Sequence, residues 1–130
     1  MIVLTIRTDN PQAEAGLFDN QTKLEYQTWQ AHRELSNTIH TTLEAVLTAQ
    51  QKTWKDIDGI VVYQGPGSFT GLRIGMSVAN ALAASLHVPI VAEQTESWVQ
   101  KGITRLQAGG QDEVALPFYG RDANITSPHK

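Results

Sequence analysis

The sequence predicts a single α/β domain with a mixed β-sheet, in the order β-β-β-α-β-α-β-α. Three observations carry this prediction. Short segments rich in β-branched and aromatic residues come first, separated by turn-forming residues. Apolar residues then recur at helical spacing. Finally, an apolar run at 60–63 is followed by a glycine-rich loop, which is typical of a buried strand leading into a helix. Meandering strands followed by α/β crossovers give a mixed sheet covered by helices.

The first three elements are predicted to be strands. Residues 2–7 (IVLTIR) form a short β-branched segment. Residues 14–18 and 22–29 flank Asp19-Asn20-Gln21, a turn-forming tripeptide, so we expect these two segments to form a hairpin.

The later elements alternate between helix and strand. Residues 31–50 have one apolar stripe at helical spacing, formed by Leu35, Ile39, Leu43, Val46 and Leu47. A last candidate strand at 112–119 contains Pro117, which disfavours it. The remaining predicted elements are a strand at 60–63, a helix at 69–87, a strand at 88–92 and a helix at 95–108.

Composition narrows the function classes. A chain of 130 residues holds one domain with one core. The 10 basic residues are scattered among 13 acidic ones, and nucleic-acid binding by this chain alone normally needs a basic stripe. The absence of cysteine excludes disulfides, thiolate catalysis and cysteine-ligated metals. No signal-peptide or membrane-spanning pattern is visible, so we expect a cytoplasmic protein without a membrane partner.

The loop QGPGSFTGLRIG, residues 64–75, raises the question of phosphate binding. A Walker A loop requires a Gly-Lys-Ser/Thr sequence, and this loop has no lysine. A nucleophile elbow requires glycine two residues before and after the serine, but Ser68 is flanked there by Pro66 and Thr70. Both of these assignments fail.

A dinucleotide site remains as the alternative function. The pattern Gly65-x-Gly67-x-x-x-Gly71 follows a strand and opens a helix, and Glu93 lies where a ribose-binding carboxylate could be. The spacing exceeds the usual fingerprint by one residue, and three strands precede it. The alternative is therefore a small nucleotide- or dinucleotide-binding enzyme that uses this loop. On propensity alone a structural role is favoured, in which Ser68 or Thr70 caps the following helix.

Residues 65–75, Gly-Pro-Gly-Ser-Phe-Thr-Gly-Leu-Arg-Ile-Gly, resemble the signature of the TsaB (YeaZ) family of bacterial tRNA threonylcarbamoyladenosine synthesis. A long, nearly gap-free match is more specific than Gly-x-Gly alone. The flanks at 56–59 and 88–91 are also similar to the family, and the segment 116–128 resembles its ending. The motif residues carried over are Gly65, Pro66, Gly67, Ser68, Phe69, Thr70, Gly71, Arg73 and Gly75.

The resemblance implies a fold and a domain organisation. Family members adopt the actin-like ATPase (ASKHA, ribonuclease H-like) fold. Residues 1–110 are then expected to form its N-terminal lobe, and residues 111–130 a strand or tail like the family's ending. Full-length members carry a second lobe between these parts, which the resemblance implies is absent here.

The resemblance also implies a function. It indicates a non-catalytic scaffold subunit of the bacterial tRNA N6-threonylcarbamoyladenosine (t6A37) synthesis complex, an accessory to the transferase. Its direct partner would be TsaD, which binds metal and nucleotide, and TsaE would act on the assembled complex. Contact with tRNA would be indirect, and a homodimer is an alternative assembly in isolation. No cofactor is expected on this chain alone, although a nucleotide at a partner interface is compatible with the resemblance.

Departures from related enzymes argue against catalysis by this chain. Actin-like enzymes end their first strand in an aspartate that organises metal and phosphate, whereas this chain has Arg7 there and Asp9 two residues later. Leu35 stands where the family has a histidine. We therefore predict no catalytic residue and no metal site. The His-x-x-x-His pair by which TsaD holds metal is not matched by His32, His40, His87 and His129.

The second predicted helix suggests a partner interface. No charged residue lies between Ile74 and Leu86, so the apolar arc is wider than a one-sided helix needs. We expect Ile74, Val78 and Leu82 to cover the sheet, and the small residues to let another helix approach closely. In the TsaB family such helix pairs contact TsaD. The alternative is that the first helix of the same chain covers this surface. The predicted interface residues are Ser36, Leu43, Leu47, Gly71, Gly75, Ala79 and Ala83.

Overall fold

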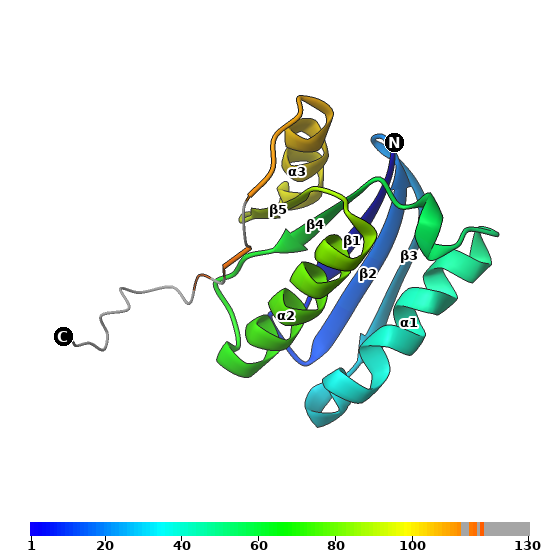
Figure 1. The fold of residues 1–130 in the computed structure, drawn as a ribbon. Coiled ribbons are helices and arrows are strands. Elements are labelled where there is room, and N and C mark those ends of the chain that lie inside the picture. The colour runs from blue at the N-terminus through cyan, green and yellow to red at the C-terminus, as the bar shows by residue number, and fades with distance from the viewer. Residues whose placement is uncertain (113–114, 117, 119–130) are drawn as a thin grey trace.

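The structure, a computed structural model, describes residues 1–112, 115, 116 and 118. Its sheet has the strand order β3-β2-β1-β4-β5, in which β1 pairs antiparallel with β2 and parallel with β4. Helices α1 and α2 lie side by side on one face, and α3 packs on the β4–β5 part of the other (Figure 1). The elements are β1 (Ile2–Arg7), β2 (Gln12–Asp19), β3 (Thr22–Gln30), η1 (His32–Glu34), α1 (Leu35–Ala49), η2 (Trp54–Asp56), β4 (Gly59–Tyr63), α2 (Phe69–Leu86), β5 (Ile90–Glu93) and α3 (Trp98–Gln107).

The predicted mixed α/β sheet is confirmed, and the boundaries of several elements shift. The helix expected over 31–50 starts with a 3-10 turn and becomes α-helical at Leu35. The helix expected from residue 95 begins at Trp98, because a turn with Thr95 at φ 75° comes first. The candidate strand at 112–119 lies partly outside the described residues, and its described residues form no strand.

Two hydrophobic cores lie on opposite faces of the sheet. Leu4 and Ile60 belong to the core beneath α1 and α2, whereas Val3 and Val61 belong to the core beneath α3. This alternation follows from the two-residue period of a strand. All five residues of β4 are buried because helices cover both of its faces, as the continuous apolar run predicted.

The buried side of α2 is the reverse of the predicted one. The small residues Gly75, Ala79 and Ala83 face the sheet and are buried, together with Leu72 and Met76. The flank expected to cover the sheet consists of Ile74, Val78 and Leu82. It is only partly buried and packs at the edge of the core. Small side chains here bring the helix close to the sheet, not to a second helix.

This packing corrects the predicted partner interface. Leu43 is 0% exposed and Leu47 is 2% exposed, so the first helix uses both in its own core. Gly75, Ala79 and Ala83 are buried as well. These five residues are therefore used in the chain's own core and offer very little exposed surface. Of the seven residues predicted, only Ser36 is exposed and only Gly71 is partly exposed.

Two glycines let α2 approach the end of β1. The hydroxyl of Thr8 donates a hydrogen bond to the carbonyl oxygen of Gly71 at 2.8 Å, and Thr8 is 1% exposed. A Cβ at Gly71 would overlap the Thr8 carbonyl oxygen, and one at Gly75 would overlap the Thr8 side chain. The absence of both side chains allows backbone-to-backbone packing here.

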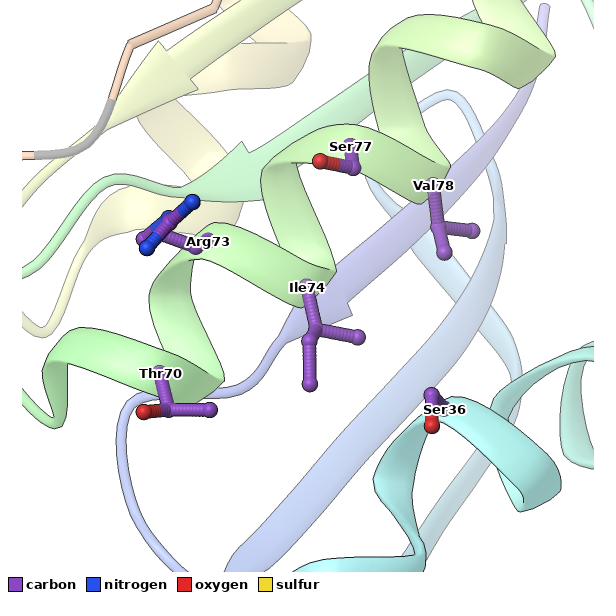
Figure 2. A pocket seen from close by; sticks show the side chains of 6 residues that line it. All are labelled: Ser36, Thr70, Arg73, Ile74, Ser77 and Val78. Atoms are coloured by element: carbon purple, nitrogen blue, oxygen red, sulfur yellow. The ribbon is translucent and has the colours of Figure 1, made fainter.

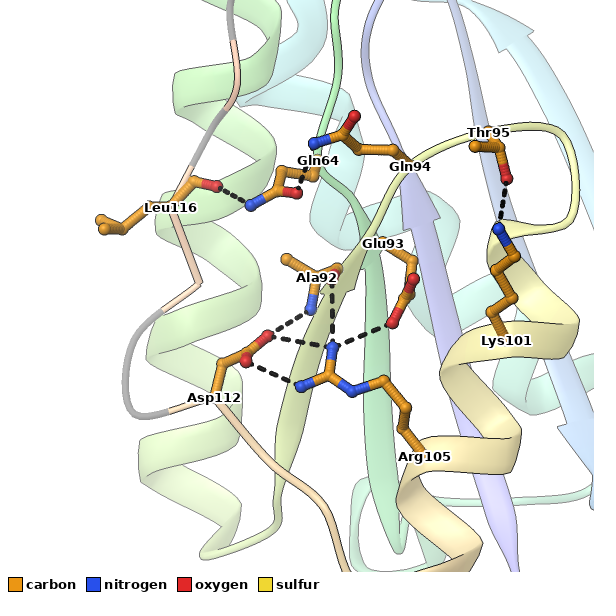
Figure 3. Close-up of polar contacts among 9 residues, drawn as sticks. All are labelled: Gln64, Ala92, Glu93, Gln94, Thr95, Lys101, Arg105, Asp112 and Leu116. Carbon is orange, nitrogen blue, oxygen red and sulfur yellow. Dashed lines mark hydrogen bonds and ion pairs between the residues drawn. The ribbon is translucent and has the colours of Figure 1, made fainter.

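A segment after α3 covers the outer edge of β5 (Figure 3). The N–H of Asp112 donates to the carbonyl oxygen of Ile90 at 2.7 Å, and the N–H of Ala92 donates to the Asp112 carboxylate at 2.8 Å. Arg105 pairs with Asp112 at 2.8 Å and with Glu93 at 2.9 Å. These contacts occupy backbone groups that an open sheet edge would leave unpaired.

The same segment is also attached to α2 and to the end of β4. The side-chain amide of Asn80 both donates to and accepts from the backbone of Ala115, each at 2.9 Å. The side-chain amide of Gln64 donates to the carbonyl oxygen of Leu116 at 3.0 Å. Asn80 and Gln64 thus hold Ala115 and Leu116 through side-chain hydrogen bonds.

We predict that Ala79→Arg unfolds or strongly destabilises the chain, because Ala79 is 0% exposed and faces the sheet. A long charged side chain there must overlap the core or bury its charge, which costs more than about 3 kcal/mol. Chemical denaturation monitored by circular dichroism measures the loss. The matched control is Ser77→Arg on the exposed side of α2, which should change stability by less than about 0.5 kcal/mol. A stable Ala79→Arg variant would contradict the buried position.

Gly71→Ala should also destabilise the chain, although alanine favours helix by about 1 kcal/mol over glycine. The new Cβ meets a backbone carbonyl, which cannot rotate away, so we expect a net loss of about 1–3 kcal/mol. The midpoint of thermal unfolding checks this. An unchanged or raised midpoint would show that α2 does not need this close approach.

Asp112 provides a pH-dependent prediction. Burial by itself would raise the pKa of Asp112, but the hydrogen bonds from Arg105 and from the Ala92 N–H lower it below its usual value. A carboxyl whose pKa is lowered on folding stabilises the fold above its unfolded pKa and loses this effect as the pH falls through the folded pKa. Asp112→Asn should therefore be less stable than the parent at neutral pH, and the difference should shrink below about pH 4. A difference that is independent of pH in denaturation curves would contradict this.

Candidate partner-binding groove

The glycine loop is packed against the β1–β2 connection. The Ser68 N–H donates to the carbonyl oxygen of Asp9 at 2.7 Å, and Asp9 fills the space that a Cβ at Gly67 would need. Ser68 is the N-cap residue of α2, and its hydroxyl accepts a hydrogen bond from the Gly71 N–H at 3.4 Å, which confirms its expected capping role. Gly65 has a φ of 116°, which favours glycine. The loop therefore uses its backbone to join α2 to the sheet.

The acidic groups that a nucleotide site would use are already paired. Glu93, the candidate ribose ligand, accepts from Arg105 at 2.9 Å. Arg7 holds Asp9 through two hydrogen bonds of 2.8 and 3.2 Å, and its guanidinium carbon lies 4.0 Å from the centre of the Tyr63 ring. The hydrogen bond to Asp9 is the main reason that the pKa of Arg7 is raised. Both carboxylates near the loop are thus neutralised within the chain.

A concave surface lies between α1 and α2 (Figure 2). One hollow of about 360 Å³ is lined by Ser36, Thr70, Arg73, Ile74, Ser77 and Val78. An adjoining hollow of about 370 Å³ is lined by Asn10, Pro11, Ala31, Arg33, Leu35, Ser68, Thr70, Gly71 and Ile74. Because Thr70 and Ile74 line both hollows, we treat them as one surface, the α1–α2 groove.

The α1–α2 groove has an apolar floor and polar residues at its rim. Ile74 and Val78 point from α2 toward α1 and form an apolar floor, while Ser36 and Ser77 lie at the rim (Figure 2). None of the described residues that line the groove has a carboxylate or an imidazole, so they offer no general base and no metal ligand set. An apolar floor with a polar rim is typical of a protein-binding surface.

The sequence identified part of this groove and misplaced the rest. Ser36 and Gly71 were predicted as interface residues, and the motif residues Ser68, Thr70 and Arg73 also line it. Ile74 and Val78 were missed as surface residues, because they were assigned to the sheet side. The uncharged run from residue 74 to 86 signalled two apolar flanks, but it could not tell which flank the sheet would cover.

Two further properties concern the described residues as a whole. Within them, no group of three or more histidine, aspartate or glutamate side chains is arranged to hold a metal ion. In the same part of the chain, none of the helices is both long and apolar enough to span a bilayer.

Sequence comparisons relate the chain to known proteins. Residues 29–121 match the family model described as TsaD: tRNA N6-adenosine threonylcarbamoyltransferase. The chain is 30% identical over 138 residues to the tRNA threonylcarbamoyladenosine biosynthesis protein TsaB of Escherichia coli (strain K12), covering 95% of this chain and 57% of the relative. It is 45% identical over 60 residues to the tRNA N6-adenosine threonylcarbamoyltransferase of Geotalea uraniireducens (strain Rf4), covering 46% of this chain and 18% of the relative. The chain thus spans little more than half of the E. coli relative.

Structural comparisons agree on the fold. YeaZ from Pseudomonas aeruginosa superposes with a TM-score of 0.68 at 22% identity, covering 82% of this chain and 50% of YeaZ. Thermus thermophilus RuvC superposes with a TM-score of 0.52 at 13% identity, covering 92% of this chain and 86% of RuvC. The predicted ASKHA, ribonuclease H-like fold is confirmed by these neighbours. The TsaD family model matches most of the chain, so the chain belongs to the family that this model describes. Within it, the similarity to TsaB relatives identifies the chain as a TsaB (YeaZ) family member.

Proposed function

We propose that this chain acts in t6A synthesis as a non-catalytic scaffold that binds TsaD through the α1–α2 groove. The observation that carries the proposal is the groove itself, which has an apolar floor and no reactive side chain among its described lining residues. The names of the E. coli and Bacillus subtilis TsaB relatives support a place in threonylcarbamoyladenosine synthesis. In this proposal TsaE acts on the assembled cytoplasmic complex, and tRNA contacts this chain only indirectly.

The groove has the shape that a partner helix needs. Two neighbouring helices with a hollow between them accept a third helix, whose apolar side chains fill the hollow. Ile74 and Val78 are partly buried within this chain, so a partner would remove their remaining apolar surface from water. Ser36 and Ser77 at the rim are exposed and can hydrogen-bond to the partner without leaving buried polar groups unpaired.

The glycine loop supports the scaffold role more than the nucleotide-binding alternative. Its approach to the sheet uses the Ser68 N–H and the space next to Gly67, and Glu93 is paired with Arg105. A phosphate would have to displace Asp9 from the loop to reach these groups. Any nucleotide of the complex is therefore assigned to the partner or to the interface with it.

Filling the groove with a bulky side chain tests the proposal. Ser77→Trp and Ser36→Trp should each weaken binding to TsaD by at least about tenfold, because the indole occupies the space of the partner helix. Titration calorimetry with purified TsaD gives the dissociation constant, and t6A formation by the reconstituted enzymes should fall with it. Both serines are exposed, so the variants should unfold at the parental temperature.

Ser85→Trp is the matched control, since Ser85 is an exposed α2 residue that is not among the described residues lining the groove. We expect it to bind TsaD like the parent. Full binding by both groove variants would place the TsaD contact elsewhere. Micromolar binding of ATP or NAD by the isolated chain would instead favour the enzyme alternative.

A further inference from the structure

We infer that the partner segment in the α1–α2 groove is acidic, with carboxylate side chains that pair with Arg33 and Arg73. The inference rests on the proposed function, since it concerns the same groove. It adds the chemistry of the occupant: an apolar helical stripe flanked by aspartate or glutamate.

The four arginines that the structure describes fall into two groups. Arg7 and Arg105 each hold a carboxylate at 2.8 Å, so their charges are neutralised within the fold. In the part of the chain that the structure describes, neither Arg33 nor Arg73 takes part in an ion pair. These two are the arginines that line the groove, one in each hollow. The described fold thus pairs its other arginines internally and leaves two cations at the candidate interface.

The groove is positive on a chain that is negative overall. The formal net charge is −3, yet the described lining residues include two arginines and no aspartate or glutamate. Of the nearest acids, Asp9 is held by Arg7, and Glu34 neither lines the groove nor forms an ion pair with Arg33 among the described residues. A basic partner would therefore meet uncompensated like charge, whereas an acidic one would gain electrostatic attraction.

Arginine is well suited to this role. Its planar guanidinium can make two parallel hydrogen bonds to one carboxylate. The guanidinium carbon of Arg73 lies 5.3 Å from the centre of the Phe69 ring, a cation–π contact that restricts the side chain before a partner arrives. Preorganisation of this kind lowers the entropy that binding must overcome.

A phosphate backbone is the other anion that two arginines could bind. The groove favours a protein partner, because a surface that binds nucleic acid needs several cations along the phosphate backbone or an aromatic platform for the bases. Here two cations border an aliphatic floor of Ile74 and Val78. An acidic amphipathic helix matches both features at once.

The test reverses each charge and follows the association with TsaD. Arg33→Glu and Arg73→Glu should each lower the association rate constant by about 5–10-fold at low ionic strength, and the double variant by more. The loss should shrink at about 0.5 M salt, because exposed charges are then screened. Arg33→Gln and Arg73→Gln should lie between the parent and the reversals. Surface plasmon resonance at several salt concentrations gives these rates.

Lys101→Glu is the charge-reversal control, since Lys101 is an exposed residue of α3, which packs on the other face of the sheet. It should leave the association rate unchanged. Thermal unfolding at the parental temperature shows that each variant is folded.

The outcomes separate this inference from the proposed function. If Ser77→Trp blocks TsaD but the arginine reversals change neither the rate nor its salt dependence, the groove binds TsaD and the acidic partner is wrong. Faster association of the reversed variants would indicate a basic partner and also overturn it. Weaker binding of tRNA in fluorescence anisotropy, with TsaD binding unchanged, would assign the arginines to nucleic acid instead. If Ser77→Trp has no effect, the proposed function fails and this inference fails with it.

Discussion

The close contact between α2 and the end of β1 is the constraint on which the rest of this fold depends. Thr8 lies against Gly71 and Gly75, and its hydroxyl bonds the Gly71 carbonyl oxygen. This contact requires the glycine face of α2 to point at the sheet. The remaining apolar flank, with Ile74 and Val78, is then turned toward α1 and becomes the floor of the groove. The glycine motif and the candidate binding surface are thus two sides of one helix.

The opposite end of the sheet shows how the fold treats its polar groups. Arg105 binds Asp112 and Glu93, and Asp112 bonds the outer backbone of β5. Together with the Arg7–Asp9 pair, this leaves the carboxylates near the parallel strand ends paired with cations of the same chain. A site for phosphate or metal would need some of these groups to be free. The groove between α1 and α2 differs, because its two arginines have no ion pair among the described residues.

Much of the fold followed from local sequence. The five strands and three helices were predicted from β-branched segments, turn-forming residues, a continuous apolar run and apolar residues at helical spacing, all of which are local in the chain. The capping role of Ser68 was predicted from its place before the helix. The turn at Thr95 was not, because a positive φ at a threonine has no strong sequence signal. The sequence did not reveal that five of the predicted interface residues are buried in this chain's own core, namely Leu43, Leu47, Gly75, Ala79 and Ala83.

The order of elements, the buried strand β4 and the family motif at 65–75 could be predicted from local sequence, because each depends on residues close together in the chain. Which flank of α2 meets the sheet depends instead on long-range packing. Helical periodicity shows which residues form an apolar arc, but it does not show which element packs against that arc. The arc of α2 is wide enough for either flank to pack against the sheet. The choice depended on Thr8, more than sixty residues earlier, whose packing admits glycine but no Cβ. That long-range contact also decided that the groove is lined by Ile74 and Val78.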